Sequence, residues 1–452
     1  MTLASPIRAG LTLAVLATLA CMSVRPSHAA EPGYEIQVGV GESDNIERLP
    51  SGGTDETIAT EEVDFAWHEK RPWFDADVDA DVSHVDFLQH TYPDEFIGNF
   101  IGSSKVNFVP EVFSWDFADN FGQTPLNPLA PITPDNRENI NYFSTGPVLS
   151  LPLAQELKLV LMGEYGRVDY EDGLSPLDNN RMTGTVGLLH QMSRDTNISV
   201  NVRDERVDFQ NDLINPDYNR QEAFARFDTK GSRTELGVDL GYGRLLMSGA
   251  DEGTYVARLD ITRRVSPYST VGLSFGHDYS DGADSFVLLQ AANGANLNTP
   301  TALQTGAPFL ITYASLAWNF ERERTTTSLT ASYFKDQYQL DSGLNNDVVL
   351  GSIRIARQVS PLLQVALGEY VDREHFTTGG DTATEADTGL QVTWRAGRSI
   401  SVFFSYYLAK GFSDLEIGKF TENRVWLSIG YGRAAEVAPG PAPVRLPGQT
   451  YN

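Results

Sequence analysis

Four aspartates at alternate positions are the first residues whose spacing suggests chemistry. Asp75, Asp77, Asp79 and Asp81 are separated by alanine and valine. A calcium-binding loop needs a sharp glycine turn so that alternate oxygens converge on one ion, and this segment has the pattern of an extended strand. We therefore expect a row of carboxylates along one face of a strand and no calcium loop.

The histidines do not have the spacing of a catalytic or metal-binding set. His277 and Ser280 are three positions apart in an alternating segment, so they point to opposite sides of a strand and cannot act as base and nucleophile. His68, His84, His90 and His375 are scattered along the chain. We expect no enzymatic activity, no metal site and no cofactor.

Composition excludes several classes of protein. The chain has 452 residues with 60 acidic and 34 basic side chains, a formal net charge of -26. Nucleic-acid binding needs clustered Lys and Arg for phosphate contacts, so nucleic acid is not an expected partner. A single cysteine excludes a disulfide framework and a cysteine-based zinc cluster.

Apolar and polar residues alternate along most of the chain. Val238 and Leu240 flank Asp239 in one such segment, and similar segments recur between residues 34 and 432. Side chains of a strand point to opposite faces in turn. The segments run for about 10 to 15 residues, long enough to cross a bilayer at a tilt, whereas strands of soluble sandwiches average about 5 or 6. The pattern predicts an all-β fold, a transmembrane antiparallel β-barrel of the bacterial outer membrane.

Turn lengths predict the orientation and the number of strands. Short junctions such as Ser266–Tyr268 and Ser360–Leu362 alternate with long polar connections, among them 119–139 and 282–308. In outer-membrane barrels short turns face the periplasm and long loops face outward. A turn at Val109-Pro110-Glu111 is needed for consistent strand directions. The count is then about twenty strands with both termini periplasmic, or eighteen if the first hairpin is not integrated.

The two ends of the chain have different compositions from the barrel. Arg8, an apolar stretch and Ser27-His28-Ala29 are typical of a secretory signal peptide at residues 1–29. Its removal, with Arg8 and Arg25, changes the net charge from -26 to -28. The barrel is expected at residues 30–433. Residues 434–452 contain four prolines and predict an extended periplasmic tail.

The polar face of the strands supplies candidate residues for the lumen of the barrel. Both signs of charge occur, which suits ion selectivity or the binding of a polar polymer, and the sequence does not separate these two roles. The candidates are Asp75, Asp77, Asp79, Asp81, Asp239, Arg258, Asp260, Arg354 and Arg395. Either of the two long connections, 119–139 or 282–308, could also fold inward and constrict the pore, and for 119–139 a rigid external cap is the alternative.

Three segments resemble a known family. Residues 114–123, 131–139 and 143–147, which include Ser114-Trp115-Asp116-Phe117 and Phe143-Ser144-Thr145-Gly146-Pro147, are similar to outer-membrane β-barrels found with bacterial exopolysaccharide and exosortase (PEP-CTERM) systems. The resemblance implies export or handling of a surface polysaccharide. The implied partners are outer-membrane lipid and lipopolysaccharide, polysaccharide and periplasmic export components. A small-solute porin and a non-conducting structural barrel are the alternatives.

Overall fold

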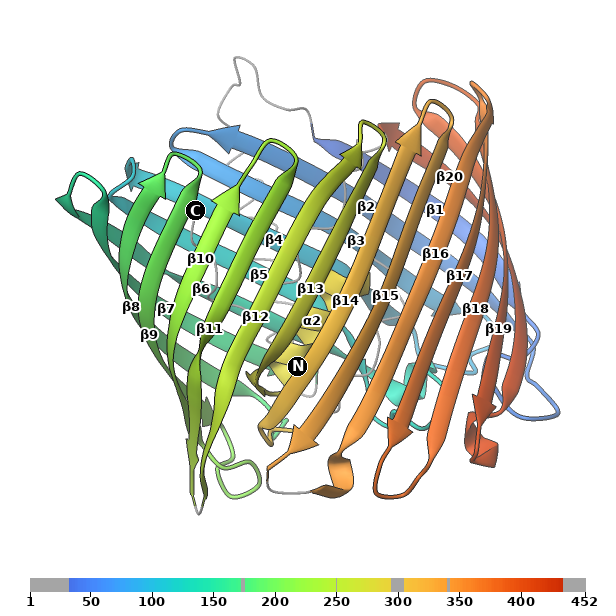
Figure 1. The fold of residues 1–452 in the computed structure, drawn as a ribbon. Helices are drawn as coiled ribbons and strands as arrows, with labels where there is room; N and C mark the ends of the chain where they lie inside the picture. Colours follow the sequence, from blue (N-terminus) through green and yellow to red (C-terminus); the bar gives the residue numbers. More distant parts are fainter. Residues whose placement is uncertain (1–31, 172–174, 249, 294–304, 340–341, 434–452) are drawn as a thin grey trace, which may run out of the picture.

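A closed sheet dominates the molecule. The structure, a computed structural model, describes residues 32–171, 175–248, 250–293, 305–339 and 342–433. These residues form one antiparallel sheet of 20 strands in which β1 (Gly33–Ser43) pairs with both β2 (Glu56–Arg71) and β20 (Phe420–Arg433), so that the sheet closes into a barrel (Figure 1). The prediction of about twenty strands is confirmed. The eighteen-strand alternative is wrong because the first hairpin closes the sheet.

The strands are long, from 11 residues in β1 to 18 in β6. Each remaining strand pairs with its neighbours in chain order. They are β3 (Phe74–Phe87), β4 (Glu95–Val109), β5 (Phe113–Pro125), β6 (Arg137–Ala154), β7 (Leu157–Tyr170), β8 (Asn179–Ser193), β9 (Thr196–Phe209), β10 (Tyr218–Lys230), β11 (Thr234–Met247), β12 (Ala250–Ser266), β13 (Ser269–Ser280), β14 (Phe309–Arg322), β15 (Thr325–Tyr338), β16 (Asn346–Ser360), β17 (Leu363–Phe376), β18 (Thr382–Arg395) and β19 (Ile400–Ser413).

The helical elements lie in the connections between strands. They are the 3-10 turns η1 (Pro134–Asn136), η2 (Ser342–Leu344) and η3 (Glu416–Gly418), and the α-helix α2 (Gly282–Asn293). None of the helices in the described ranges is both long enough and apolar enough to cross a membrane.

The two faces of the sheet differ as the alternation predicts. On β11, Leu240 is 61% exposed on the outer face, whereas the adjacent Asp239 is 3% exposed on the inner face. Val200 on β9 also lies on the outer face at 61% exposure, next to the buried Asn201. An apolar outside and a polar inside suit a barrel that is surrounded by lipid and encloses polar groups.

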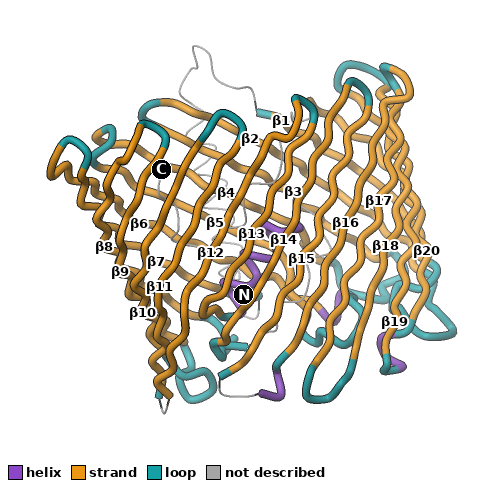
Figure 2. Tube along the Cα trace, in the orientation of Figure 1, coloured by secondary structure: helices purple, strands orange, loops and turns teal. Residues whose placement is uncertain are grey.

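The two ends of the barrel have connections of different length (Figure 2). One end carries short turns, and here β4 and β5 are joined through Pro110, with Glu111 in the left-handed region at φ 61°. The turn that the strand directions require is therefore confirmed. The first and last strands meet at this same end, where Tyr34 pairs with Arg433. The longer loops, with the 3-10 turns η1, η2 and η3, lie at the other end. The predicted signal peptide and the predicted tail from residue 434 lie outside the described residues.

Helix α2 lies inside the barrel. It follows β13 and is drawn within the wall of the barrel (Figures 1 and 2). Phe286, Leu288, Leu289 and Gln290 are each at most 2% exposed, which shows that the helix is buried around its circumference. The start of the predicted connection 282–308, residues 282–293, therefore lies in the lumen, and residues 294–304 lie outside the described residues.

Candidate functional site

The inner wall of the barrel is the candidate functional site, and strand register identifies its residues. Asn99 on β4 is hydrogen bonded to Gln290 of α2, so Asn99 points into the lumen. Asp81 is the direct register partner of Asn99 and shares that face. Because alternate residues of a strand point to the same side, the row of aspartates on β3 that begins at Asp75 also lies on the inner wall.

The other predicted lumen residues lie on the inner side at separate places. Asp239 and Arg258, on β11 and β12, approach to 3.5 Å. Asp260 follows on the same face of β12 and accepts a hydrogen bond from Ser274 at 2.9 Å. Arg354 on β16 donates a hydrogen bond to the Gln391 side chain of β18 at 3.1 Å. Arg395 lies four residues after Gln391 and therefore on the same inner face of β18.

Asp239 and Arg258 belong to a larger set of buried ion pairs, which we call the arginine network. Its arginine side chains are at most 6% exposed, and each has a carboxylate oxygen within 3.1 Å. The arginines are Arg181, Arg203, Arg220, Arg226 and Arg258; the buried carboxylates are Glu205, Glu222, Asp239, Asp278, Asp281 and Asp284. The cations are thus neutralised within the wall and present little free positive charge to a solute.

The sequence contains a signal for part of this network that the sequence analysis missed. Arg203 and Glu205 alternate with apolar or exposed positions on β9, and Arg220, Glu222 and Arg226 do so on β10. Arg203 and Glu205 lie on the face opposite the apolar Val200 and Val202, and lipid does not solvate charges, so this face of the strand must be the one that lines the lumen. Asp281 precedes α2 and Asp284 lies in its first turn, so the strand periodicity does not extend to these two members of the network.

Two carboxylates at the start of α2, Asp281 just before the helix and Asp284 in its first turn, hold the helix to the wall. Arg181 contacts Asp281 at 2.7 Å and Asp284 at 3.1 Å. Arg220 contacts Asp284 at 2.8 Å. The Asp281 carboxylate also accepts a hydrogen bond from the Tyr218 hydroxyl, and its other oxygen accepts the backbone N–H of Asp284 at 2.9 Å, which caps the start of the helix.

Apolar packing fixes the opposite side of α2. Phe286 and its neighbours join a buried cluster with side chains of β6, β7, β14, β15 and β16. Gly122 on β5 permits the close approach of the Phe286 ring, since a Cβ at that position would meet ring carbons at 3.1 Å. Gln290 donates to the Phe121 carbonyl at 2.8 Å and to the Asn99 side chain at 2.9 Å. The helix is therefore anchored on several sides of the barrel and narrows the lumen.

A second, more open group of charges lies on β2 and β3. We call it the acidic column; its members are Glu62, Asp64, Asp75, Asp77, Asp79 and Asp81, with His68 among them. Asp64 accepts a hydrogen bond from Gln37 at 2.8 Å, and Lys70 lies 4.0 Å from Asp75. In contrast to the arginine network, the column has few cationic partners, so this part of the wall is negative.

The loop predicted to constrict or cap the pore at 119–139 is shorter than expected and lies at the long-loop end. β5 extends to Pro125 and β6 begins at Arg137, so the sheet takes up both ends of the predicted loop. Asn136 holds the remainder compact through its contacts with Asn127. The Leu129 carbonyl lies close to Gly418 of the β19–β20 connection. The loop therefore reaches past the ends of neighbouring strands to the β19–β20 connection.

An ion pair secures the β1–β2 loop at the same end. Arg48 contacts Glu422 at 3.0 Å and also Glu385. Burial lowers the pKa of the Arg48 guanidinium, but the two carboxylates outweigh that effect and the pKa is raised above its ordinary value. The guanidinium thus stays charged and joins the first loop to β18 and β20.

No protein-family model matches the chain, and no curated protein matches its sequence. Solved structures similar to it include the siderophore receptor PirA from Acinetobacter baumannii, with 8% identity over 90% of this chain and 81% of that one and a TM-score of 0.46.

Two further structures come from Pseudomonas aeruginosa. One is OccK2 (OpdF) in complex with glucuronate, with 10% identity, 89% and 98% coverage and a TM-score of 0.36. The other is the outer membrane protein OpdK, with 11% identity, 89% and 99% coverage and a TM-score of 0.35. These values describe a broad likeness of barrel shape and support no conclusion about function.

The closed sheet and its apolar exterior decide the class of fold. Every described strand has a partner on both edges, so no edge is left unpaired in lipid. The fold is that of an outer-membrane β-barrel. Its polar interior, narrowed by α2, gives the barrel a channel-like form.

Proposed function

We propose that the protein is an outer-membrane channel for polar solutes, inserted after signal-peptide-dependent export with its short turns in the periplasm. The observation that carries this proposal is the combination of an apolar outer face with a polar lumen in one closed barrel. Helix α2 serves as the constriction that selects what passes. A small-solute porin and a non-conducting structural barrel are the competing functions.

The substrate we favour is a neutral or weakly charged exopolysaccharide. A polyanion would need free arginines or lysines along its path. In this lumen the arginine network is already neutralised by its own carboxylates, and the acidic column presents negative charge. Handling of surface polysaccharide, with periplasmic export components as partners, is the role that the family resemblance implies.

Ion selectivity in planar bilayers tests the channel itself. Purified protein should conduct and should pass cations in preference to anions, because charges in a low-dielectric lumen focus the field. Replacing Asp75, Asp77, Asp79 and Asp81 together by Asn should move the reversal potential in a salt gradient toward anion preference. Absence of any conductance would contradict the channel and support a structural barrel.

Shortening the α2 connection tests the constriction and the substrate. Ser280 and Phe309 are register partners, so a short glycine-rich turn can join β13 to β14 directly. The shortened barrel should show a larger single-channel conductance than the wild type. Uptake of neutral oligosaccharides of increasing length into proteoliposomes then separates the two channel functions, since a small-solute porin would pass only the shortest ones.

A further inference from the structure

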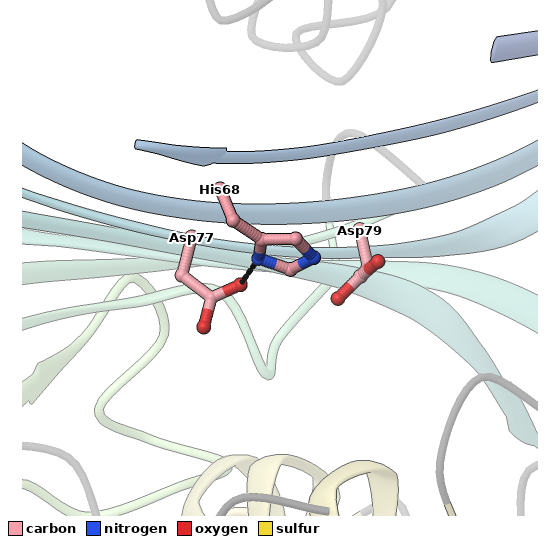
Figure 3. Close-up of side chains that lie close together, drawn as sticks. All are labelled: His68, Asp77 and Asp79. Atoms are coloured by element: carbon pink, nitrogen blue, oxygen red, sulfur yellow. Dashed lines mark ion pairs between the residues drawn. The ribbon is translucent and has the colours of Figure 1, made fainter. Parts of the chain in front are cut away.

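We propose that His68, Asp77 and Asp79 form a binding site for a divalent transition-metal ion on the inner wall of the barrel. The three residues come from adjacent strands, with His68 on β2 directly opposite Asp77 on β3. One ligand atom from each residue lies within 4.8 Å of the other two. The histidine ring lies between the two carboxylates, all three on one side of the strands (Figure 3).

The histidine is held in the orientation that metal ligands use. Its Nδ1 lies 2.6 Å from a carboxylate oxygen of Asp77, whereas its Nε2 is buried and has no hydrogen-bond partner among the described residues. A proton shared with the carboxylate at Nδ1 leaves the lone pair of Nε2 available, and a carboxylate–histidine pair of this kind fixes the tautomer and ring orientation of metal-bound histidines. In Figure 3 this second nitrogen is on the side of Asp79, whose carboxylate supplies oxygen to the same ion.

The donor set determines the class of ion. One imidazole nitrogen with carboxylate oxygens suits Mn²⁺, Fe²⁺, Co²⁺, Ni²⁺ or Zn²⁺, while Ca²⁺ prefers six to eight oxygens. Asp77 acts as the positioning residue through His68, since its carboxylate lies at Nδ1 and Asp79 lies on the side of Nε2. With Nε2 of His68 and the Asp79 carboxylate as its protein ligands, the ion would keep coordination positions open to water or to a passing ligand.

The surroundings favour cations at this point. Glu62, Asp64 and Asp81 form a neighbouring group on the same face of β2 and β3, with ligand atoms also within 4.8 Å of one another. These carboxylates raise the local concentration of cations without themselves offering nitrogen. The histidine is therefore what distinguishes a site for a transition metal from the general negative potential of the acidic column.

Binding of Mn²⁺ to the purified, folded barrel in detergent tests the proposal without any need for transport. Continuous-wave EPR counts the free ion, and pulsed EPR detects the nitrogen of a coordinated imidazole. The wild type should bind one ion per barrel with a nitrogen coupling, and Zn²⁺ should displace it. His68→Gln should abolish the coupling, and Asp79→Asn should weaken binding by about tenfold or more.

Two controls and a second histidine variant keep the test decisive. The controls are Asp75→Asn and His84→Gln. Asp75 belongs to the acidic column and lies closer to the β2–β3 turn, and His84 lies on the outer face of β3 against Phe96. Both variants should bind Mn²⁺ like the wild type. His68→Asn replaces His68→Gln if the latter does not fold, as judged by heat-dependent gel mobility. Three results would each overturn the proposal. The first is an equal loss of affinity in Asp75→Asn and Asp79→Asn, and the second is a nitrogen coupling that survives the loss of His68. The third is the absence of stoichiometric binding by the wild type.

Discussion

Replacement of Arg220 by methionine removes the central cation between the barrel wall and α2. The side chain is 3% exposed and contacts Asp284 at 2.8 Å, Glu205 on the adjacent strand, and the Tyr279 carbonyl at 2.6 Å. Methionine keeps the length and apolar volume of the side chain, so that the variant changes charge and hydrogen bonding more than packing.

The expected cost follows from what the partners lose. Removing one member of a buried ion pair costs about 3–5 kcal/mol, because the remaining charge is left without compensation in a medium of low dielectric. Glu205 keeps Arg203 at 3.1 Å, and Asp284 keeps Arg181 at 3.1 Å. We therefore expect Arg220→Met to lower the free energy of unfolding by an amount at the lower end of that range, about 3 kcal/mol.

Reversible urea unfolding of the barrel in phospholipid vesicles, followed by tryptophan fluorescence, measures this cost. Arg206→Met is the matched control, because Arg206 lies on the outer face of β9 and its pair with Asp208 is exposed. That control should change the unfolding midpoint little. The double variant Arg220→Met/Asp284→Asn should recover part of the loss, because it also removes one uncompensated carboxylate.

Equal midpoint shifts in Arg220→Met and Arg206→Met would refute the reasoning, since burial is the only reason to expect different costs. Additive effects of Arg220→Met and Asp284→Asn would contradict the contact between the wall and α2, because residues that share one ion pair show coupling in a double-mutant cycle.

Two further substitutions test the faces of the wall and the packing of α2. Leu240→Arg places a charge in the lipid near the middle of β11 and should lower the free energy of unfolding by about 2–4 kcal/mol in the same urea assay. Asp239→Asn should lower it less, because Arg226 and Arg258 each keep a closer carboxylate. Equal losses of stability would show that Leu240 and Asp239 do not face lipid and lumen as assigned. Phe286→Ala removes a ring that is 1% exposed and should reduce the stability of the packed α2 by about 3–5 kcal/mol. Single-channel currents should then be larger or noisier than in the wild type. Currents identical to the wild type would show that the ring does not hold the constriction.

The sequence by itself determined the fold class, because the determinants of a β-barrel are local. Alternation along a segment such as Leu236–Tyr242 assigns each side chain to lipid or lumen without knowledge of its neighbours. Turn residues such as Pro110 mark where strands reverse, and the parity of strand directions then fixes their number. For the same reason the inner face of β3 could be assigned to its aspartates before any contact was known.

Tertiary structure decided what depends on pairing between segments that are distant in the sequence. The position of α2 in the lumen follows from ion pairs between Asp284 and arginines far from it in sequence, and a helix that is buried on all sides has no amphipathic pattern to reveal it. His68 and Asp77 meet only through the register of β2 against β3, which is set by cross-strand hydrogen bonds. Linear spacing could not show that pair, because metal and ion-pair geometry depends on distances across the sheet.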